Sequence, residues 1–394
     1  MRFLFLACLT LVLAGCQQLN AFKDLAGAVS ELITGADNAE PPKELQPLEP
    51  TVTMDVVWNT TVGKGLNGSI VNLVPTVTAT TIYVADHKGL LMAVNRENGD
   101  TEWSRETGLE ISSGPVVAGD RLVFGTSNGD LVVVSLTDGA LIWKAALTSE
   151  MVSLPRVGRN VVVVRTTDGR VAGFDLGKGD VKWSHERLLP PLSVRSLGSP
   201  TIDGDIVIDG SGAGKVVALD LRDGHQVWES VVQVPRGRSE VERMVEFDAD
   251  PVVRGDTVYV SGFQGGLAAL DAATGAIRWH QKTAYTSNST AVGRKSLFIT
   301  DNVSDVWGMD ISNGADQWKQ DVLHQRRLTV PAQIREYLVV GDFEGYLHLL
   351  RADNGSLVGR LELGSDPIIA TPVVYDDTMY VLNSKGVLSA VKVQ

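Results

Sequence analysis

Six histidines are the side chains in this sequence best suited to ligating a metal or moving a proton. No two of them have the HxH or HExxH spacing that brings two imidazoles to one metal, so they do not predict a metal site. They are His87, His185, His225, His280, His324 and His348. Asp220 and Asp271 each follow an expected strand, where capping of a turn is preferred over a calcium site. The residue types therefore predict no catalytic residue and no cofactor.

Cys16 is the residue that the sequence marks for covalent modification. The apolar run from Phe3 to Leu13 is eleven residues long, too short to span a bilayer, and it indicates a secretory signal over residues 1–15. The run ends in Leu13-Ala-Gly-Cys16, which resembles the site where bacterial lipoproteins are cleaved and acylated, for example with palmitate. The alternative is a signal peptide with a chance cysteine. Gln17 after the cysteine favours sorting to the outer membrane.

Acidic residues outnumber basic residues by 47 to 35. Removal of the signal takes away Arg2, so the mature chain would carry 34 basic and 47 acidic side chains and a net charge of −13. Binding to nucleic acid needs a basic surface, so this composition excludes that class of partner. Cys16 would be the only thiol of the mature chain, which leaves no disulfide, CxxC metal site or cysteine nucleophile.

Residues 16–50 are predicted to form a lipid-anchored tether that ends in a linker. Apolar residues recur at helical spacing from Leu19 to Ile33, which fits either a short interfacial helix or an irregular tether. Residues 41–50 contain four prolines, a composition typical of a stiff linker. The folded domain is therefore predicted to occupy residues 51–394.

A short motif, a turn glycine followed by an alternating strand, recurs through this domain. Its anchor residues are Gly89, Gly129, Gly169, Gly214, Gly265, Ser304 in place of a glycine, Gly345 and Gly386. The intervals between them are 40, 40, 45, 51, 39, 41 and 41 residues. A period of about 40–45 residues is that of a four-stranded propeller blade.

Three further positions keep a fixed distance from each anchor. Fourteen residues before it stand Pro75, Pro115, Pro155, Pro200, Pro251, Pro331 and Pro372, with Thr290 in the sixth copy. Ten residues after it stands a second turn glycine, and fourteen after it stand Trp103, Trp143, Trp183, Trp228, Trp279 and Trp318, with Gly359 in the seventh copy. A tryptophan on an outer strand can wedge between adjacent blades, an interpretation preferred over ligand contact.

The two ends of the domain are predicted to complete one blade together. The eighth copy stops at Gln394, before the outer strand that would carry a tryptophan. The segment from Met54 to Trp58 supplies such a strand from the other end, and a ring closed in this way has no free sheet edge at the closure. We therefore predict an all-β, eight-bladed propeller of four-stranded antiparallel blades.

Binding is predicted where the repeat is longest. The connectors that follow Trp183 and Trp228 span 17 and 23 residues, whereas the others span 11 to 13. Both connectors emerge on one face of a propeller, and loops on a rigid scaffold commonly carry binding. In Leu188–Arg195 and Arg236–Asp250 they contain leucine, methionine and phenylalanine residues, including Phe247, beside arginines. These apolar residues are expected to be exposed, a composition typical of protein interfaces. The alternative is that the apolar residues pack against their own blades.

The repeat from Gly265 to Trp279, G-x-L-x-A-L-D-x-x-T-G-x-x-x-W, resembles the tryptophan-docking repeat of quinoprotein dehydrogenases. That resemblance implies an enzyme with pyrroloquinoline quinone and calcium as the alternative function. Those enzymes stack a vicinal disulfide on the quinone, and the mature chain has no cysteine pair to form one. A shared repeat indicates a fold and not a chemistry.

Taken over the whole chain, the lipidation motif, proline-rich linker and eight repeats resemble the BamB family of lipoproteins. Four stretches carry the resemblance: Leu192–Arg195, Ser239–Pro251, Leu323–Thr329 and Gly341–Leu347. It implies a non-enzymatic scaffold without a cofactor, anchored in the outer membrane and facing the periplasm, within the Bam complex that assembles β-barrels. A different envelope adaptor is a further alternative.

The same resemblance implies the partners and the contact residues. The main partner would be the POTRA domains of the barrel subunit, BamA, with unfolded outer-membrane proteins as a second class. Carried over by position, the contact residues are Leu192, Val194, Arg195, Glu246 and Asp248. Val194 and Glu246 differ from the commoner leucine and aspartate but keep the chemical type. Capture of client strands by blade edges is disfavoured as the main mode because the ring is closed.

Overall fold

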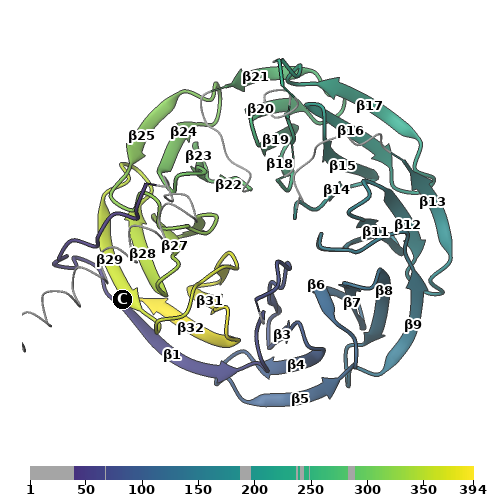
Figure 1. The fold of residues 1–394 in the computed structure, drawn as a ribbon, viewed down its shortest axis with the longest axis horizontal. Coiled ribbons are helices and arrows are strands. Elements are labelled where there is room, and N and C mark those ends of the chain that lie inside the picture. Colours follow the sequence, from purple (N-terminus) through teal and green to yellow (C-terminus); the bar gives the residue numbers. More distant parts are fainter. Residues whose placement is uncertain are drawn as a thin grey trace, which may run out of the picture. The chain divides into compact units, whose positions relative to one another are not determined.

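The computed structural model describes residues 40–66, 68–186, 197–236, 238–239, 244–247, 249–282 and 289–394. Pro42–Gln394 form one compact unit. This unit contains eight four-stranded antiparallel sheets arranged as blades around a centre (Figure 1). The predicted eight-bladed propeller is confirmed. None of the described residues belongs to a helix that is long and apolar enough to cross a membrane.

The first four blades follow one another along the chain. Blade 1 contains β2 (Thr76–Val77), β3 (Thr81–Ala85), β4 (Leu90–Asn95) and β5 (Thr101–Glu106). Blade 2 contains β6 (Ile111–Ala118), β7 (Arg121–Thr126), β8 (Asp130–Ser135) and β9 (Leu141–Ala146). Blade 3 contains β10 (Arg156–Gly158), β11 (Val161–Arg165), β12 (Val171–Asp175) and β13 (Val181–His185). Blade 4 contains β14 (Thr201–Asp203), β15 (Ile206–Ser211), β16 (Lys215–Asp220) and β17 (Gln226–Val231).

The last four blades keep this order except at the closure. Blade 5 contains β18 (Val252–Arg254), β19 (Thr257–Gly262), β20 (Gly266–Asp271) and β21 (Ile277–Gln281). Blade 6 contains β22 (Ala291–Val292), β23 (Ser296–Thr300), β24 (Val306–Asp310) and β25 (Asp316–Gln320). Blade 7 contains β26 (Ala332–Ile334), β27 (Tyr337–Gly341), β28 (Tyr346–Arg351) and β29 (Leu357–Glu362). Blade 8 contains β30 (Val373–Tyr375), β31 (Thr378–Leu382), β32 (Val387–Val393) and β1 (Met54–Thr61).

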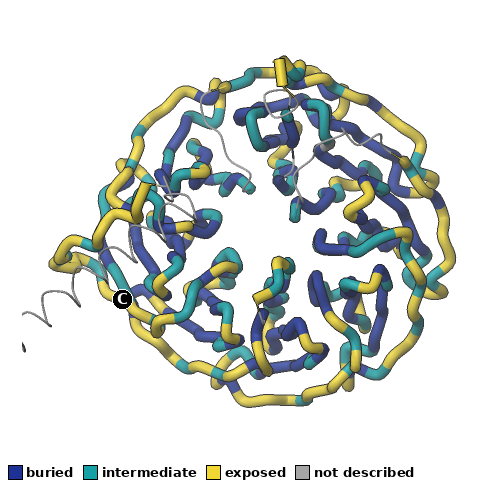
Figure 2. Tube along the Cα trace, viewed as in Figure 1, coloured by how far each residue is buried: buried dark blue, intermediate teal, exposed yellow. Residues whose placement is uncertain are grey.

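The second and third strands of each blade form its core. Strand β11, Val-Val-Val-Val-Arg, is buried along its whole length, as expected for a strand covered on both faces by neighbouring blades. The outer strands carry most of the exposed residues of the blades (Figure 2), and β5 and β9 are exposed at most positions. Ser304, the one anchor that is not a glycine, has a φ of 68°, a left-handed conformation that costs a serine more than a glycine.

Each outer strand contains a β-bulge immediately before its tryptophan, or before Gly359 in blade 7, a feature that the sequence pattern did not predict. The extra residue is Val57, Glu102, Ile142, Lys182, Val227, Arg278, Gln317 or Val358. A bulge turns the following side chain and increases the local twist. It also leaves apolar side chains such as Val57 and Ile142 exposed on the outside of the ring.

Seven tryptophans lie at the seams between blades, at the positions given by the repeat. Each indole N–H donates to a backbone carbonyl of the next blade at 2.9–3.2 Å. Each ring also lies against the second turn glycine of that blade, where a Cβ would come within 2.4–2.9 Å of the ring. The tryptophans are Trp58, Trp103, Trp143, Trp183, Trp228, Trp279 and Trp318.

The ring closes through β1, which pairs antiparallel with β32 from Met54–Val393 to Thr61–Val387. The seam between blades 7 and 8 has Gly359 where the other outer strands carry a tryptophan. The chain entering β1 fills this place, because the carbonyl oxygen of Val52 lies 2.5 Å from where a Cβ on Gly359 would stand. The amides of Thr51 and Val52 donate to the carbonyl of Val358, the bulged residue, at 2.9 and 3.1 Å.

Residues 43–52, here called the strap, contact the ring, although residues up to 50 were predicted to be a linker. The amide of Lys43 donates to the His324 carbonyl at 3.0 Å. Leu45 packs against the core shared by blades 6 and 7. The prediction of a linker over residues 41–50 therefore missed the contacts that Lys43 and Leu45 make with the ring.

Candidate protein-docking face

The predicted contact residues fall mainly outside the described residues. Leu192, Val194 and Arg195 of the first long connector, Asp248 of the second, and the predicted lipidation site Cys16 are among those not described. Glu246 is described. The geometry of the candidate face therefore comes from the segments by which the two connectors return to the ring.

The first connector returns along blade 3. The hydroxyl of Ser153 donates to the Gly198 carbonyl at 2.7 Å. The amide of Leu154 donates to the Ser199 hydroxyl at 2.8 Å. These bonds hold the entry to β14 against the entry to β10, so the base of the first connector is tied to a neighbouring blade.

Asp250 joins the bases of the two connectors. One carboxylate oxygen accepts the Ser199 amide at 2.7 Å, and the other pairs with Arg156 at 2.6 Å. The amide of Asp250 itself donates to the Ser289 hydroxyl at 2.9 Å. One side chain thus connects blades 3, 4 and 5, and the predicted proximity of the two long connectors is observed at their bases.

The second connector returns through a segment that lies inside the ring. Phe247 is only 1% exposed and packs in the core shared by blades 4 and 5. Its carbonyl oxygen lies 2.0 Å from where a Cβ on Gly210 would stand, and the Glu246 carbonyl lies 1.8 Å from that position on Gly262. Both positions therefore require glycine. The expectation of an exposed Phe247 was wrong, and for this residue the alternative of packing against its own blades holds.

Glu246 lies in the same buried segment, with 4% of its surface exposed. Its amide donates to the Phe263 carbonyl at 3.0 Å, and the residue forms an isolated bridge with Gly212. The backbone of Glu246 thus helps to fix the base of the second connector. Its predicted contact with a partner remains a prediction.

The described acidic clusters cap turns. Asp220, Asp223 and His225 lie close enough together to share a cation, but Asp220 accepts both the amide and the guanidinium of Arg222, which lowers the pKa of its carboxyl. Asp271 accepts the guanidinium of Arg278 and backbone amides of the following turn, which lower its pKa to about 2. Capping accounts for both carboxylates.

Blade 2 contains a serine motif typical of some hydrolases. Gly125-Thr-Ser-Asn-Gly129 has the G-x-S-x-G spacing of a serine-nucleophile elbow, which requires a turn from a strand into a helix. Here it is the turn from β7 into β8, two antiparallel strands of one blade. The motif therefore belongs to the propeller repeat.

The bases of both connectors also line the mouth of the central channel. The channel holds a cavity of about 870 Å³, whose lining includes Gly198, Ala249 and Asp250. The described bases of the connectors thus lie beside this cavity, together with residues such as Leu154 and Thr329 that lead into other blades.

Comparison with known proteins identifies the family. A family model described as outer membrane protein assembly factor BamB matches residues 51–137 and 106–320. A BamB of Legionella pneumophila (strain Paris) is 40% identical over 366 residues, 93% of this chain and 95% of the relative. A BamB of Pseudomonas aeruginosa is 41% identical over 367 residues, 93% and 96% of the two chains. The chain belongs to the BamB family of outer-membrane protein assembly factors.

Solved structures extend the likeness in fold. The BamB of Moraxella catarrhalis superposes with a TM-score of 0.77 at 23% identity, over 86% of this chain and 99% of that one. A quinohaemoprotein alcohol dehydrogenase of Comamonas testosteroni reaches 0.69 at 10% identity, over 86% and 76%. The dehydrogenase shares only the fold, whereas the BamB proteins share sequence along nearly the whole chain. The chain is thus a non-enzymatic BamB-family member and not a quinoprotein dehydrogenase.

Proposed function

We propose that this chain is a scaffold subunit of the β-barrel assembly machinery that docks on the POTRA domains of the barrel subunit through its two long connectors. The observation that carries the proposal is the joint at Asp250, which binds the base of the first connector at 2.7 Å and itself belongs to the second. Two loops tied together on a rigid ring can present one preorganised surface, which lowers the entropy cost of binding.

The proposed contact combines charge and apolar burial. Arg195 would form a charge-assisted hydrogen bond with the POTRA domain, and Leu192 and Val194 would fill an apolar recess beside it. Glu246 and Asp248 would supply acidic contacts from the second connector. Glu246 is buried in the unbound chain, so its contact would require a local rearrangement of residues 244–247.

The proposed location follows from the N-terminal sequence. Acylation of Cys16 would anchor the chain in the outer membrane, and the ring would face the periplasm. A single acyl chain gives only marginal membrane binding, and a second acyl chain would make the anchoring stable without a spanning helix. In this setting, docking would hold the POTRA domains in an orientation that favours the transfer of unfolded outer-membrane proteins to the barrel subunit.

A charge reversal at Arg195 tests the proposal. The Arg195→Glu variant of the full-length lipoprotein is expected to lose at least about tenfold of the co-purifying barrel subunit, because a desolvated charge pair becomes a repulsion. Its melting temperature should stay within about 1–2 °C of the wild type. The measurement is a quantitative pull-down from solubilised membranes.

The matched control is Arg254→Glu, the same charge reversal at an exposed position at the opposite end of β18 from the second connector. It should leave co-purification unchanged. Full co-purification with Arg195→Glu, or equal loss with both variants, would show that the assigned face is not the docking face.

A further inference from the structure

The strap lies against a surface of blades 6 and 7, here called the seat, which has no part in the proposed docking. The amide of Lys43 donates to the His324 carbonyl at 3.0 Å, and its ammonium group pairs with Asp321 at 3.1 Å. Leu45 packs against an apolar cluster drawn from both blades. That cluster contains Phe298, Val306, Leu323, Leu328, Leu338, Val340 and Leu350. The strap is thus held by its backbone, by the Lys43 ion pair and by the Leu45 side chain.

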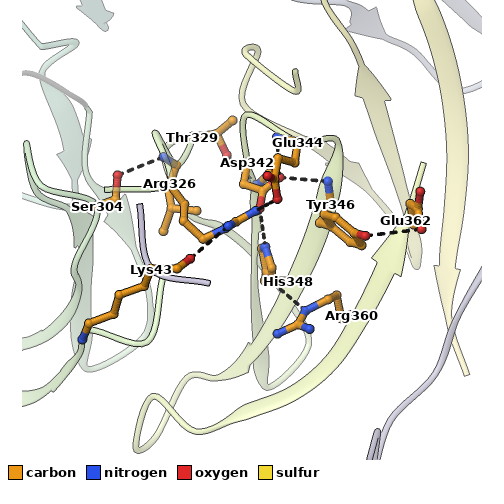
Figure 3. Close-up of polar contacts among 12 residues, drawn as sticks. Lys43, Ser304, Arg326, Thr329, Asp342, Glu344, Tyr346, His348, Arg360 and Glu362 are labelled. Atoms are coloured by element: carbon orange, nitrogen blue, oxygen red, sulfur yellow. Dashed lines mark hydrogen bonds and ion pairs between the residues drawn. The ribbon is translucent and has the colours of Figure 1, made fainter. Parts of the chain in front are cut away.

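Arg326 is the buried centre of this seat. Its side chain is 3% exposed, and its Nε and Nη2 atoms donate to Asp342 at 2.8 and 2.7 Å, with Glu344 also bound to Nη2. These carboxylates orient the remaining nitrogen, Nη1, which donates to the Lys43 carbonyl at 3.0 Å (Figure 3). Leaving a buried guanidinium donor without an acceptor is costly, and the strap carbonyl supplies an acceptor for Nη1.

Arg360 supplies the second donor to the strap backbone. Its Nη1 donates to the Gln46 carbonyl at 3.0 Å, and its Nε lies 3.4 Å from Nδ1 of His348. Nε2 of His348 lies 2.9 Å from the Asp342 carboxylate. A neutral imidazole with its proton on Nε2 satisfies both contacts, and burial lowers the pKa of His348 and so favours this neutral form. Asp342 therefore orients both arginines (Figure 3).

We propose that this seat is a binding site for an extended, leucine-bearing peptide, and that residues 43–46 are its resident ligand. The guanidinium groups of Arg326 and Arg360 bind main-chain carbonyls three residues apart. Such contacts select the backbone conformation of the peptide more than the identity of its side chains. Leu45 supplies the apolar anchor. The flanking Pro41, Pro42 and Pro47 favour the extended conformation that such a site selects. The Leu323–Thr329 and Gly341–Leu347 motifs, which supply Arg326 and Asp342, are the parts that build the site.

The covalent link gives the resident strap an advantage over any free peptide. A linked segment of this length acts at an effective concentration in the millimolar range. A free peptide should therefore bind weakly to the wild-type chain and more tightly when the strap has been displaced. This difference separates an exchangeable binding site from a permanently packed segment.

The test uses full-length chains and a fluorescently labelled decapeptide with the sequence of residues 41–50. The Leu45→Asp variant should release the strap, since the aspartate would have to be buried against the apolar cluster. The decapeptide should bind this variant at least about tenfold more tightly than the wild type. Adding Arg360→Ala to Leu45→Asp should remove the binding. The Glu49→Ala variant, changed at an exposed strap residue, should match the wild type.

Cleavage by a lysine-specific protease reports the position of the strap itself. Cleavage after Lys43 should be at least about tenfold faster in Leu45→Asp than in the wild type, because proteases need a locally released segment. The ring should remain intact in both. Equal decapeptide binding to all variants, no binding to Leu45→Asp up to about 1 mM, or equal cleavage at Lys43 would overturn the proposal.

Discussion

Replacement of Trp228 by alanine is expected to lower the free energy of unfolding by about 3–5 kcal/mol, the range for a buried large aromatic residue. The ring is 7% exposed and packs in the core shared by blades 4 and 5. Its N–H donates to the Ala272 carbonyl at 3.0 Å. The substitution would open a cavity at the seam and leave that carbonyl without its donor. The melting temperature should fall by roughly 5–10 °C, measured by calorimetry or circular dichroism.

A Trp228→Phe variant separates packing from hydrogen bonding. It keeps most of the apolar ring and removes only the donor, so the expected loss is about 1–2 kcal/mol. If alanine and phenylalanine destabilise equally, or if neither changes the melting temperature, the tryptophans do not act as wedges between blades. The seam at Gly275 offers a second check, because a Cβ there would lie 2.5 Å from the Trp228 ring.

Truncation of Phe247 is expected to have an effect of similar size, about 3–5 kcal/mol. The side chain is 1% exposed and lies in the returning end of the second long connector. Its loss should loosen residues 244–247 as well as the core, so docking of the barrel subunit should weaken although Phe247 is not a predicted contact residue. The measurements are urea-induced unfolding and the pull-down from membranes.

The control for Phe247→Ala is Met244→Ala, in the same segment but only half-buried. It should cost less than about 1.5 kcal/mol and leave docking nearly unchanged. An unchanged unfolding transition for Phe247→Ala would contradict the packing of this segment. A large loss of stability with full docking would show that the base of the second connector does not position the docking face.

Much of the fold was predictable because the repeat constrains it locally. Turn glycines, strand prolines and seam tryptophans such as Trp228 recur at fixed spacing, and each reflects a contact within one blade or with the next. The closure of the ring could also be predicted from the repeats. The copy that ends at Gln394 lacks its outer strand, and the segment that contains Trp58 supplies it. Regular spacing in the sequence thus translated directly into regular geometry.

The missed features depend on contacts between segments far apart in the chain. The break in the pattern at Gly359 was visible, but nothing local indicates that Val52 fills the gap. Phe247 looked exposed because it lies in a charged connector. Its burial requires the two glycines at 210 and 262, which are themselves unremarkable in sequence. In both cases the local composition, typical of an interface or of a linker, gave no sign that Phe247 and Leu45 pack against the ring.

The strap site gives a structural role to Leu323–Thr329 and Gly341–Leu347, two stretches that resemble the BamB family and take no part in the proposed docking. Arg326 lies in the connection between blades 6 and 7, and Asp342 lies in the turn between β27 and β28. The two side chains pair in the folded ring, where Arg326 binds the segment preceding the first strand. The strap and the paired long connectors lie on different blades, so the peptide site and the docking face can be tested separately. A variant that releases the strap should therefore retain the barrel subunit.

The most direct test of the proposed function is site-specific photo-crosslinking in intact membranes. A photoreactive phenylalanine analogue at position 194 is predicted to form a covalent adduct with the POTRA region of the barrel subunit. The same analogue at Asp120, an exposed turn position between β6 and β7 on the opposite face, should form none. Adducts from position 120 alone, or no adduct with the barrel subunit from position 194, would contradict docking through the paired connectors.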